Sequence, residues 1–284
     1  MNSIPLLAVA HGSRDPRSAA TVSAIVARLR ARGVDARLCF LDLNAPSVEQ
    51  VIDVVAAQGH RGAIVVPMLL GNAFHARVDL PGLLAAARRR HPQLTLTQAD
   101  VLGDDPRLIA AVRDRILETG VRLDDPGVGV ALAAVGSSSA AANARTRRIA
   151  DTLTAGTAWR AVTCFATAAE PSVTQAVSQL SPVRTLVVAP WFLAPGLLTE
   201  RVAAAANDIV ESCDDTHARV SASPSPTAPT RPSRTDGAAS MRAGSAPGAP
   251  RGVLAATIGA HEAVVEVVLD RYAAAALEVL PRSA

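Results

Sequence analysis

The sequence of 284 residues contains no lysine, and all 28 of its basic residues are arginine. This absence excludes chemistry through a lysine Schiff base and a phosphate-binding P-loop, because both need a lysine amine. Aromatic residues are also scarce, with four Phe, two Trp and one Tyr. So few rings cannot form a surface that stacks bases, and we expect no nucleic-acid partner.

Cysteine and long apolar runs are equally sparse. The three cysteines, Cys39, Cys164 and Cys213, are odd in number and have no Cys-x-x-Cys spacing. This pattern argues against a disulfide framework or a zinc-thiolate site and favours a reducing, cytoplasmic location. No apolar run reaches the ~18 residues that cross a bilayer, and the first residues lack the basic segment of a signal peptide. We therefore expect no membrane partner.

The basic charge is concentrated in one segment of biased composition. Five arginines and one aspartate between Arg219 and Arg251 give this segment a net charge of +4. The whole chain has a net charge of +3, so the rest of the chain carries −1. Within this region, Ser221–Pro250 holds six prolines and almost no large apolar residue. Such a tract cannot bury enough surface to offset its ordering entropy, so we predict a disordered loop at 221–250.

The remaining chain alternates β-type apolar runs with Ala/Leu/Arg-rich stretches at helical spacing, which predicts βα units on parallel sheets. In the first half we expect strands near 4–10, 35–42, 62–70 and 94–102, and helices near 16–32, 46–58, 77–91 and 105–119. Asp15 before Pro16 predicts an N-cap for the first helix. Asn44, followed by Ala45 and Pro46, is expected to start the second helix in a similar way.

The second half repeats the first. The run Val130–Val135 before Gly136 matches Leu6–His11 before Gly12, and Leu186–Leu193 matches Ala63–Leu70. We predict two tandem flavodoxin-like (βα)4 lobes with parallel sheets. The N-terminal lobe is expected at 1–122 and the C-terminal lobe, a degenerate repeat, at 127–284. We expect a monomer in which the lobes form a pseudo-dimer.

Two histidines follow the first and third predicted strands of the N-terminal lobe. His11 and His75 would lie at the carboxyl ends of strands that neighbour each other across the switch point, where α/β proteins bind ligands. Asp42 ends the second strand on the same edge, where it either joins the histidines or caps the helix after Pro46. Two imidazoles and a carboxylate suit a divalent first-row metal. Val135 and Leu198 replace the histidines in the second half, so we assign the chemistry to the N-terminal lobe.

Three motifs carry a family resemblance. They are the strand followed by His11-Gly12-Ser13-Arg14, the segment Phe40-Leu41-Asp42-x-x-x-Pro46-Ser47, and the segment from Pro67 to Pro81 that contains His75. Together they resemble the sirohydrochlorin chelatases, class II chelatases of the CbiX/SirB type in their long, duplicated form. The resemblance covers both halves and leaves out the proline-rich tract.

The resemblance implies a lyase that inserts Fe²⁺ or Co²⁺ into sirohydrochlorin, for siroheme or cobalamin biosynthesis, with the metal as substrate and no organic cofactor. His11 and His75 would bind the metal and accept the pyrrole N–H protons, since an imidazole exchanges protons near neutral pH. Asp42 matches the acidic residue of the family, where glutamate is usual. Arg14, Arg77 and Ser13 would contact carboxylates of the tetrapyrrole.

Other functions remain open at this point. A carrier of metal or tetrapyrrole would need the same histidines without turnover. A histidine phosphatase also has a strand-His-Gly turn, but it needs an arginine just before the histidine, where Ala10 stands. The second lobe is either a wall of the binding site or a partner-binding module. Its residues at the positions of Arg14, Arg77 and Asp42 are expected to be Ser138, Glu200 and Ala166.

Overall fold

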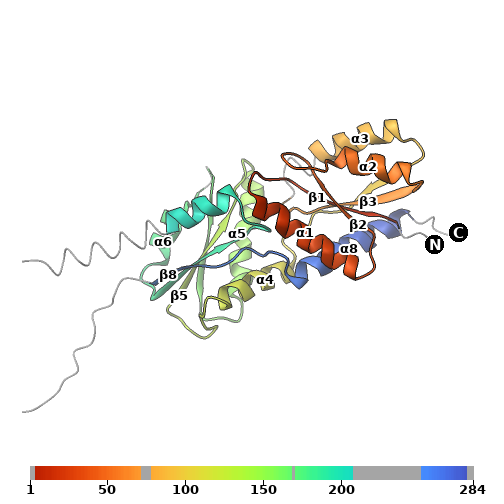
Figure 1. The fold of residues 1–284 in the computed structure, drawn as a ribbon. Coiled ribbons are helices and arrows are strands. Elements are labelled where there is room, and N and C mark those ends of the chain that lie inside the picture. The colour runs from red at the N-terminus through yellow and green to blue at the C-terminus, as the bar shows by residue number, and fades with distance from the viewer. Residues whose placement is uncertain (1–3, 72–77, 168–169, 207–250, 280–284) are drawn as a thin grey trace, which may run out of the picture.

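The computed structural model describes residues 4–71, 78–167, 170–206 and 251–279, which form two parallel four-stranded sheets flanked by helices (Figure 1). The first half contains β1 (Leu6–Ala10), α1 (Pro16–Ala31), β2 (Ala36–Phe40), α2 (Val48–Ala57), β3 (Gly62–Pro67), α3 (Leu80–Arg90), β4 (Thr95–Gln98) and α4 (Pro106–Leu117). The second half contains β5 (Val128–Ala134), α5 (Ala140–Thr154), β6 (Arg160–Phe165), α6 (Val173–Leu180), β7 (Thr185–Pro190), a helical segment at 197–206, β8 (Arg251–Leu254) and α8 (Glu262–Val279).

The strand orders are β2-β1-β3-β4 and β6-β5-β7-β8, and all pairs are parallel. The predicted fold class is therefore confirmed, with strand limits within a few residues of those expected. β1 neighbours β3, with Leu6 opposite Ile64 and Val9 opposite Pro67. Every residue of β1 and β5 is buried, as expected for central strands covered by helices on both faces. The tract 221–250 lies outside the described residues.

Local sequence signals explain where the first two helices begin. Asp15 is the N-cap of α1, as predicted, and its carboxylate accepts a 2.9 Å hydrogen bond from the Arg17 backbone N–H. The prediction for α2 was wrong. Its N-cap is Ser47, in a capping box in which Ser47 Oγ accepts from the Gln50 N–H and Gln50 Oε1 accepts from the Ser47 N–H. Asn44 thus does not start this helix.

The backbone reproduces the internal repeat in detail. The N–H of Phe40 donates to the carbonyl of Pro46 over 3.0 Å, and the N–H of Phe165 donates to the carbonyl of Pro171 over 2.9 Å. A second capping box starts α6 in the same way as the first starts α2. The two halves therefore share the loop that leads from the second strand of each sheet into its next helix.

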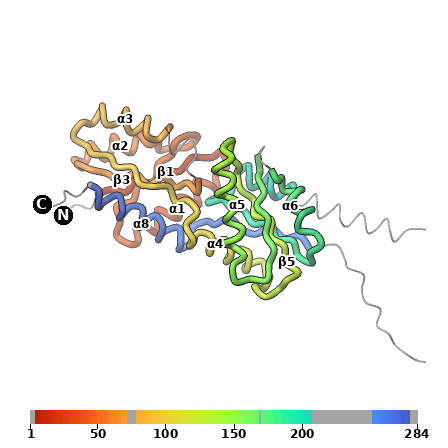
Figure 2. The backbone as a smooth tube through the Cα atoms, turned by 180° about the vertical axis from the view of Figure 1, so that it is seen from behind, coloured from red at the N-terminus to blue at the C-terminus, as the bar shows by residue number. Residues whose placement is uncertain are grey.

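The two halves exchange their last helices. α8 packs on β3, β4 and α1 of the first half, whereas α4 packs on α5 and β7 of the second. Tyr272 of α8 donates a 2.6 Å hydrogen bond to the carbonyl of Ile4, and Arg113 of α4 donates a 2.7 Å bond to that of Leu153. Both views show α8 alongside the N-terminal half of the chain (Figures 1 and 2). Each sheet therefore has one face completed by a helix of the other half.

This exchange gives the protein one continuous inner core. Buried residues of β1, β3, α1 and α8 form a single cluster with those of β5, β7, α4 and α5. Two smaller clusters lie on the outer faces, one under α2 and α3 and the other under α6 and the 197–206 segment. The inner face of each sheet is thus covered only when both halves of the chain are folded.

We expect a charge buried in α8 to unfold the N-terminal sheet, although α8 is at the other end of the sequence. Val268→Asp places a carboxylate at a side chain that is 0% exposed. The unpaired charge should cost on the order of several kcal/mol. Amide hydrogen exchange should show loss of protection in β1 and β3.

The matched control is Leu277→Asp in the same helix, where the side chain is 72% exposed. This variant should change stability by less than ~0.5 kcal/mol. If Val268→Asp removed protection from β5 and β7 but left β1 and β3 protected, the helix exchange would be wrong.

Candidate functional site

The turn that follows β1 is locked against the loop that follows β2. The N–H of Asp42 donates to the carbonyl of His11 over 3.0 Å, and the N–H of Ser13 donates to Asn44 Oδ1 over 2.7 Å. Between them Gly12 adopts a φ of +100°, and a Cβ there would lie 1.8 Å from the carbonyl oxygen of Asp42. Only glycine fits this turn, because any side chain would collide with the backbone of the second loop.

His11 and Asp42 are therefore held next to each other at the carboxyl edge of the first sheet, and both are exposed. The loop around Asp42 is tight. Asp42 Oδ1 accepts a 2.7 Å bond from the N–H of Leu43, whose φ is +63°. Since Ser47 caps α2, Asp42 has no capping role there. The alternative reading of Asp42 as a helix cap is therefore wrong.

Sequence reasoning missed Arg17, which is the second residue of α1 and directly follows the turn that begins at His11. Its guanidinium binds the Asp15 carboxylate through Nε at 3.0 Å and also contacts the Glu200 carboxylate of the second half. The hydrogen bond from the Arg17 side chain holds the pKa of Asp15 below its usual value. The Asp-Pro-Arg sequence at a helix start signals the local pair, but nothing in the sequence indicates the distant partner.

The second half contributes a facing segment. A Cβ at Gly196 would lie 3.7 Å from Ser13 Oγ, which is ordinary van der Waals distance. Gly196 precedes the helical segment at 197–206, and Thr199 Oγ1 accepts a 2.9 Å hydrogen bond from its N–H. We call the region formed by Ser13, Arg17, Gly196 and Glu200 the lobe junction. It brings the His11 turn of one half against a loop of the other.

At the corresponding edge of the second sheet, the position of His11 is taken by Val135, whose side chain is 43% exposed. The predicted match of Ala166 to Asp42 is wrong. Ala166 donates to the carbonyl of Ala134, just as Leu41 donates to that of Ala10. The counterpart of Asp42 is thus the next residue, Thr167, whose Oγ1 donates to the carbonyl of Val135 over 2.7 Å. This edge retains the backbone frame without the titratable side chains.

The structure places only part of the predicted site. Ser13 is half-buried at the lobe junction and Arg14 is exposed beside it. His75 and Arg77 lie outside the described residues. β3, the strand that precedes them, runs next to β1 and ends at Pro67. Within the described ranges no group of three His, Cys, Asp or Glu side chains could hold a metal ion. The ligand set of His11, His75 and Asp42 therefore stays a prediction.

The two described cysteines are unsuited to bind metal. Cys39 in β2 and Cys164 in β6 are both buried and have free thiols. Burial raises the pKa of both thiols, that of Cys164 to about 12. A thiol must lose its proton to ligate a metal, so these two side chains act as core residues.

The other described histidines have structural partners. His91, at the carboxyl end of α3, has its Nε2 2.6 Å from Asp53 Oδ1. His60, just before β3, has its Nε2 3.4 Å from a side-chain nitrogen of Arg37. Both are at the amino edge of the sheet, opposite His11. His261 Nδ1 accepts a hydrogen bond from the N–H of Ala263 at the start of α8. His11 is thus the one described histidine at the carboxyl edge of the first sheet.

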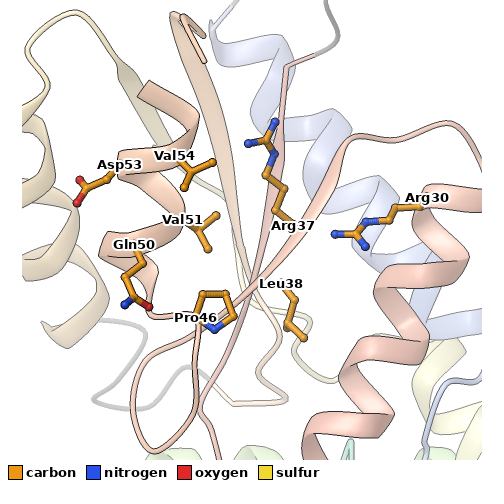
Figure 3. Close-up of a pocket in the computed structure, with 8 residues that line it drawn as sticks. All are labelled: Arg30, Arg37, Leu38, Pro46, Gln50, Val51, Asp53 and Val54. Atoms are coloured by element: carbon orange, nitrogen blue, oxygen red, sulfur yellow. The ribbon is translucent and has the colours of Figure 1, made fainter. Parts of the chain in front are cut away.

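A groove of about 700 Å³ runs along the edge strand β2 between α1 and α2 (Figure 3). Val51 and Val54 face it from α2, with Arg30 on the opposite side from α1 (Figure 3). The Arg30 Nε donates to the carbonyl of Ala36 over 2.7 Å and so covers part of the strand edge. No predicted site residue lines the groove, which is therefore separate from the His11 turn.

Comparison with known proteins decides the family. The family model described as CbiX matches residues 5–119 and again 129–275, and thus covers both halves. The chain belongs to the CbiX family. The two matches follow the internal repeat and leave out the link between halves and the chain ends. The second match also spans the proline-rich tract 221–250, which we expected to lie outside the resemblance. The predicted resemblance is confirmed.

Named relatives of this CbiX-family chain are chelatases. It is 30% identical over 203 residues to a sirohydrochlorin ferrochelatase of Priestia megaterium, an alignment that covers 69% of this chain and 76% of that protein. It is 26% identical to a sirohydrochlorin cobaltochelatase of the same species, over 69% of this chain and 66% of that one. The solved structure of SirB from Bacillus subtilis with Fe³⁺ has the same fold, with a TM-score of 0.75 at 22% identity over 98% of this chain and 97% of SirB.

Among the described residues, no helix combines the length and apolar character that crossing a membrane requires.

We expect Gly12→Ala to disrupt the His11 turn more than an equivalent change at another left-handed glycine. Gly33 has a φ of +83°, but a Cβ there would meet nothing within 4 Å. Gly33→Ala should therefore cost only the backbone strain, ~1–2 kcal/mol. Gly12→Ala should cost a further ~1–3 kcal/mol, because the methyl group collides with the Asp42 carbonyl. Chemical unfolding of both variants measures the difference, and equal losses would contradict the close approach.

Proposed function

We propose that this protein is a sirohydrochlorin chelatase, a lyase that inserts Fe²⁺ or Co²⁺ into sirohydrochlorin. Membership in the CbiX family carries the proposal, since the named relatives are ferrochelatases and cobaltochelatases of this substrate. The position of His11 supports it, because the carboxyl edge of a parallel sheet is where such folds bind ligands. The metal is a substrate, and the reaction needs no organic cofactor.

In the proposed reaction, His11 and His75 bind the incoming metal, and Asp42 is the third proposed ligand. Insertion replaces two pyrrole N–H protons by one M²⁺, so two protons must leave the macrocycle. The histidines are the proposed acceptors, because a neutral imidazole can take a proton as soon as it releases the metal. Asp42 is anchored by its own loop through Oδ1, and its second oxygen is the one available for metal or proton.

Arg14, Arg77 and Ser13 are the proposed contacts to the substrate carboxylates. Arginine suits this task because its planar guanidinium donates two parallel hydrogen bonds to one carboxylate. Ser13 lies at the lobe junction, where a ligand can touch both halves of the chain. We assign catalysis to the N-terminal lobe, 1–122, and a supporting role to the lobe at 127–284, because Val135 and Thr167 replace His11 and Asp42 there.

The proposal extends to the setting of the reaction. A monomer is consistent with two lobes that share one core within a single chain. The small, odd number of cysteines favours a cytoplasmic location. The product would enter siroheme or cobalamin synthesis, according to which metal is inserted. Imidazole and carboxylate ligands bind Fe²⁺ and Co²⁺ similarly, so metal supply decides between them. A metal or tetrapyrrole carrier is the alternative that turnover measurements distinguish.

We expect His11→Ala and His75→Ala each to lower the rate of metal insertion by at least ~100-fold, because each removes a metal ligand and a proton acceptor. The fold should survive, since His11 is exposed. Insertion is followed by the absorbance of excess sirohydrochlorin, with Fe²⁺ under anaerobic conditions and with Co²⁺ in parallel. The double variant should be little worse than the worse single variant, because the two groups act together.

The control is His60→Ala at the opposite edge of the sheet, which should change the rate less than twofold. Multiple turnovers by the unaltered protein would separate a chelatase from a carrier. A His11→Ala protein with the unaltered rate and an intact fold would remove His11 from the mechanism.

A further inference from the structure

The lobe junction contains a three-residue ion cluster that the proposed mechanism does not use. Arg17 binds Asp15 through Nε at 3.0 Å and through Nη2 at 2.5 Å, and the same Nη2 contacts Glu200. The Asp15 side chain is 9% exposed, whereas those of Arg17 and Glu200 are 56% and 59% exposed. Asp15 is thus the fixed partner of this guanidinium, and Glu200 is the solvent-accessible one.

This cluster adjoins the His11 turn. The backbone N–H of Asp15 donates to Ser13 Oγ over 3.1 Å, and Ser13 faces Gly196 of the second half. The N–H of Glu200 in turn donates to the carbonyl of Gly196 over 3.1 Å. Ser13 thus joins the His11 turn both to Asp15 and to the loop that leads into Glu200, the two partners of Arg17.

The Arg17 guanidinium is oriented before any ligand arrives. Because Asp15 holds Nε and Nη2, less side-chain freedom is lost when another carboxylate binds. An ion pair between exposed groups contributes little to stability, so Glu200 is an exchangeable partner. A substrate with several carboxylates can displace it.

We propose that Arg17 binds a carboxylate of the tetrapyrrole substrate, and that Glu200 occupies the place of that carboxylate in the substrate-free protein. This inference rests on the proposed function. It assigns an internal competitor to the binding site: Glu200 must leave Arg17 before the substrate carboxylate can bind it. Glu200 is also the residue that corresponds to Arg77 in the internal repeat of the sequence.

The chain contains a matched control. Asp105, Pro106 and Arg107 repeat the same motif at the start of α4, where Asp105 is the N-cap and Arg107 binds it through Nε at 3.0 Å. Arg107 also binds an exposed carboxylate at 2.7 Å, that of Asp270. Asp270 belongs to α8 and not to the loop that faces the His11 turn. Asp270→Asn therefore removes an equivalent ion pair that involves none of the residues of the lobe junction.

The test is titration of metal-free sirohydrochlorin into the full-length protein, followed by absorbance at constant ionic strength. Glu200→Gln should tighten binding by about two- to fivefold, because the competing charge is removed at an exposed pair. Arg17→Gln should weaken binding by about tenfold, the loss of one charge-assisted contact. Asp270→Asn should leave the Kd unchanged.

The double variant separates displacement from general repulsion. With Arg17→Gln already present, Glu200→Gln should have no further effect on the Kd, because Glu200 acts only through Arg17. Unchanged or weaker binding by Glu200→Gln alone would overturn the inference and leave the pair as a structural clamp. Tightening of equal size in both backgrounds would also overturn it. If the unaltered protein binds no sirohydrochlorin, the proposed function fails first, and this inference fails with it.

Discussion

The exchange of α4 and α8 is the constraint on which the rest of the structure depends. Each helix covers the inner face of the sheet built by the other half, and one buried cluster runs through both. Burial of apolar surface is the main favourable term in folding, so stability is shared between sequence segments that are far apart. The position of the lobes relative to each other is therefore set by the core. Contacts at the lobe junction, such as that of Arg17 with Glu200, depend on that position.

Much of the fold could be predicted from sequence because its signals are local. Strands buried on both faces appear as continuous apolar runs, and parallel order follows from the alternation with helices. The N-cap at Asp15 could be predicted for the same reason, because the capping residue and the N–H that it accepts from are only two residues apart. The place of His11 at a strand end followed from the limits of β1 alone.

Features that depend on distant contacts could not be predicted. The many apolar residues of α8 indicate that the helix is packed against other elements, but not that it packs on the first sheet. Asn44 resembles a cap in sequence, yet its side chain accepts a hydrogen bond from Ser13, 31 residues away. The counterpart of Asp42 is Thr167 and not Ala166, and this assignment depends on strand register. A register error of one residue moves each side chain to the opposite face of the sheet. Arg17 and Glu200 are 183 residues apart in the sequence, and no motif near either residue indicates that they pair.

The two halves share a backbone frame but differ in the side chains that this frame carries, and this difference underlies their different proposed roles. Both halves keep the backbone frame of the first turn, with a glycine at positive φ after the first strand: Gly12 in one and Gly136 in the other. Backbone packing requires this frame, so its presence does not indicate a catalytic role. The side chains on it differ: His11 and Asp42 in one half correspond to Val135 and Thr167 in the other. A scaffold that needs the second half for its core cannot discard it, whereas the side chains at its sheet edge are free to change. Glu200 is an example, because its side chain binds Arg17 of the first half and is not needed by the fold of its own sheet.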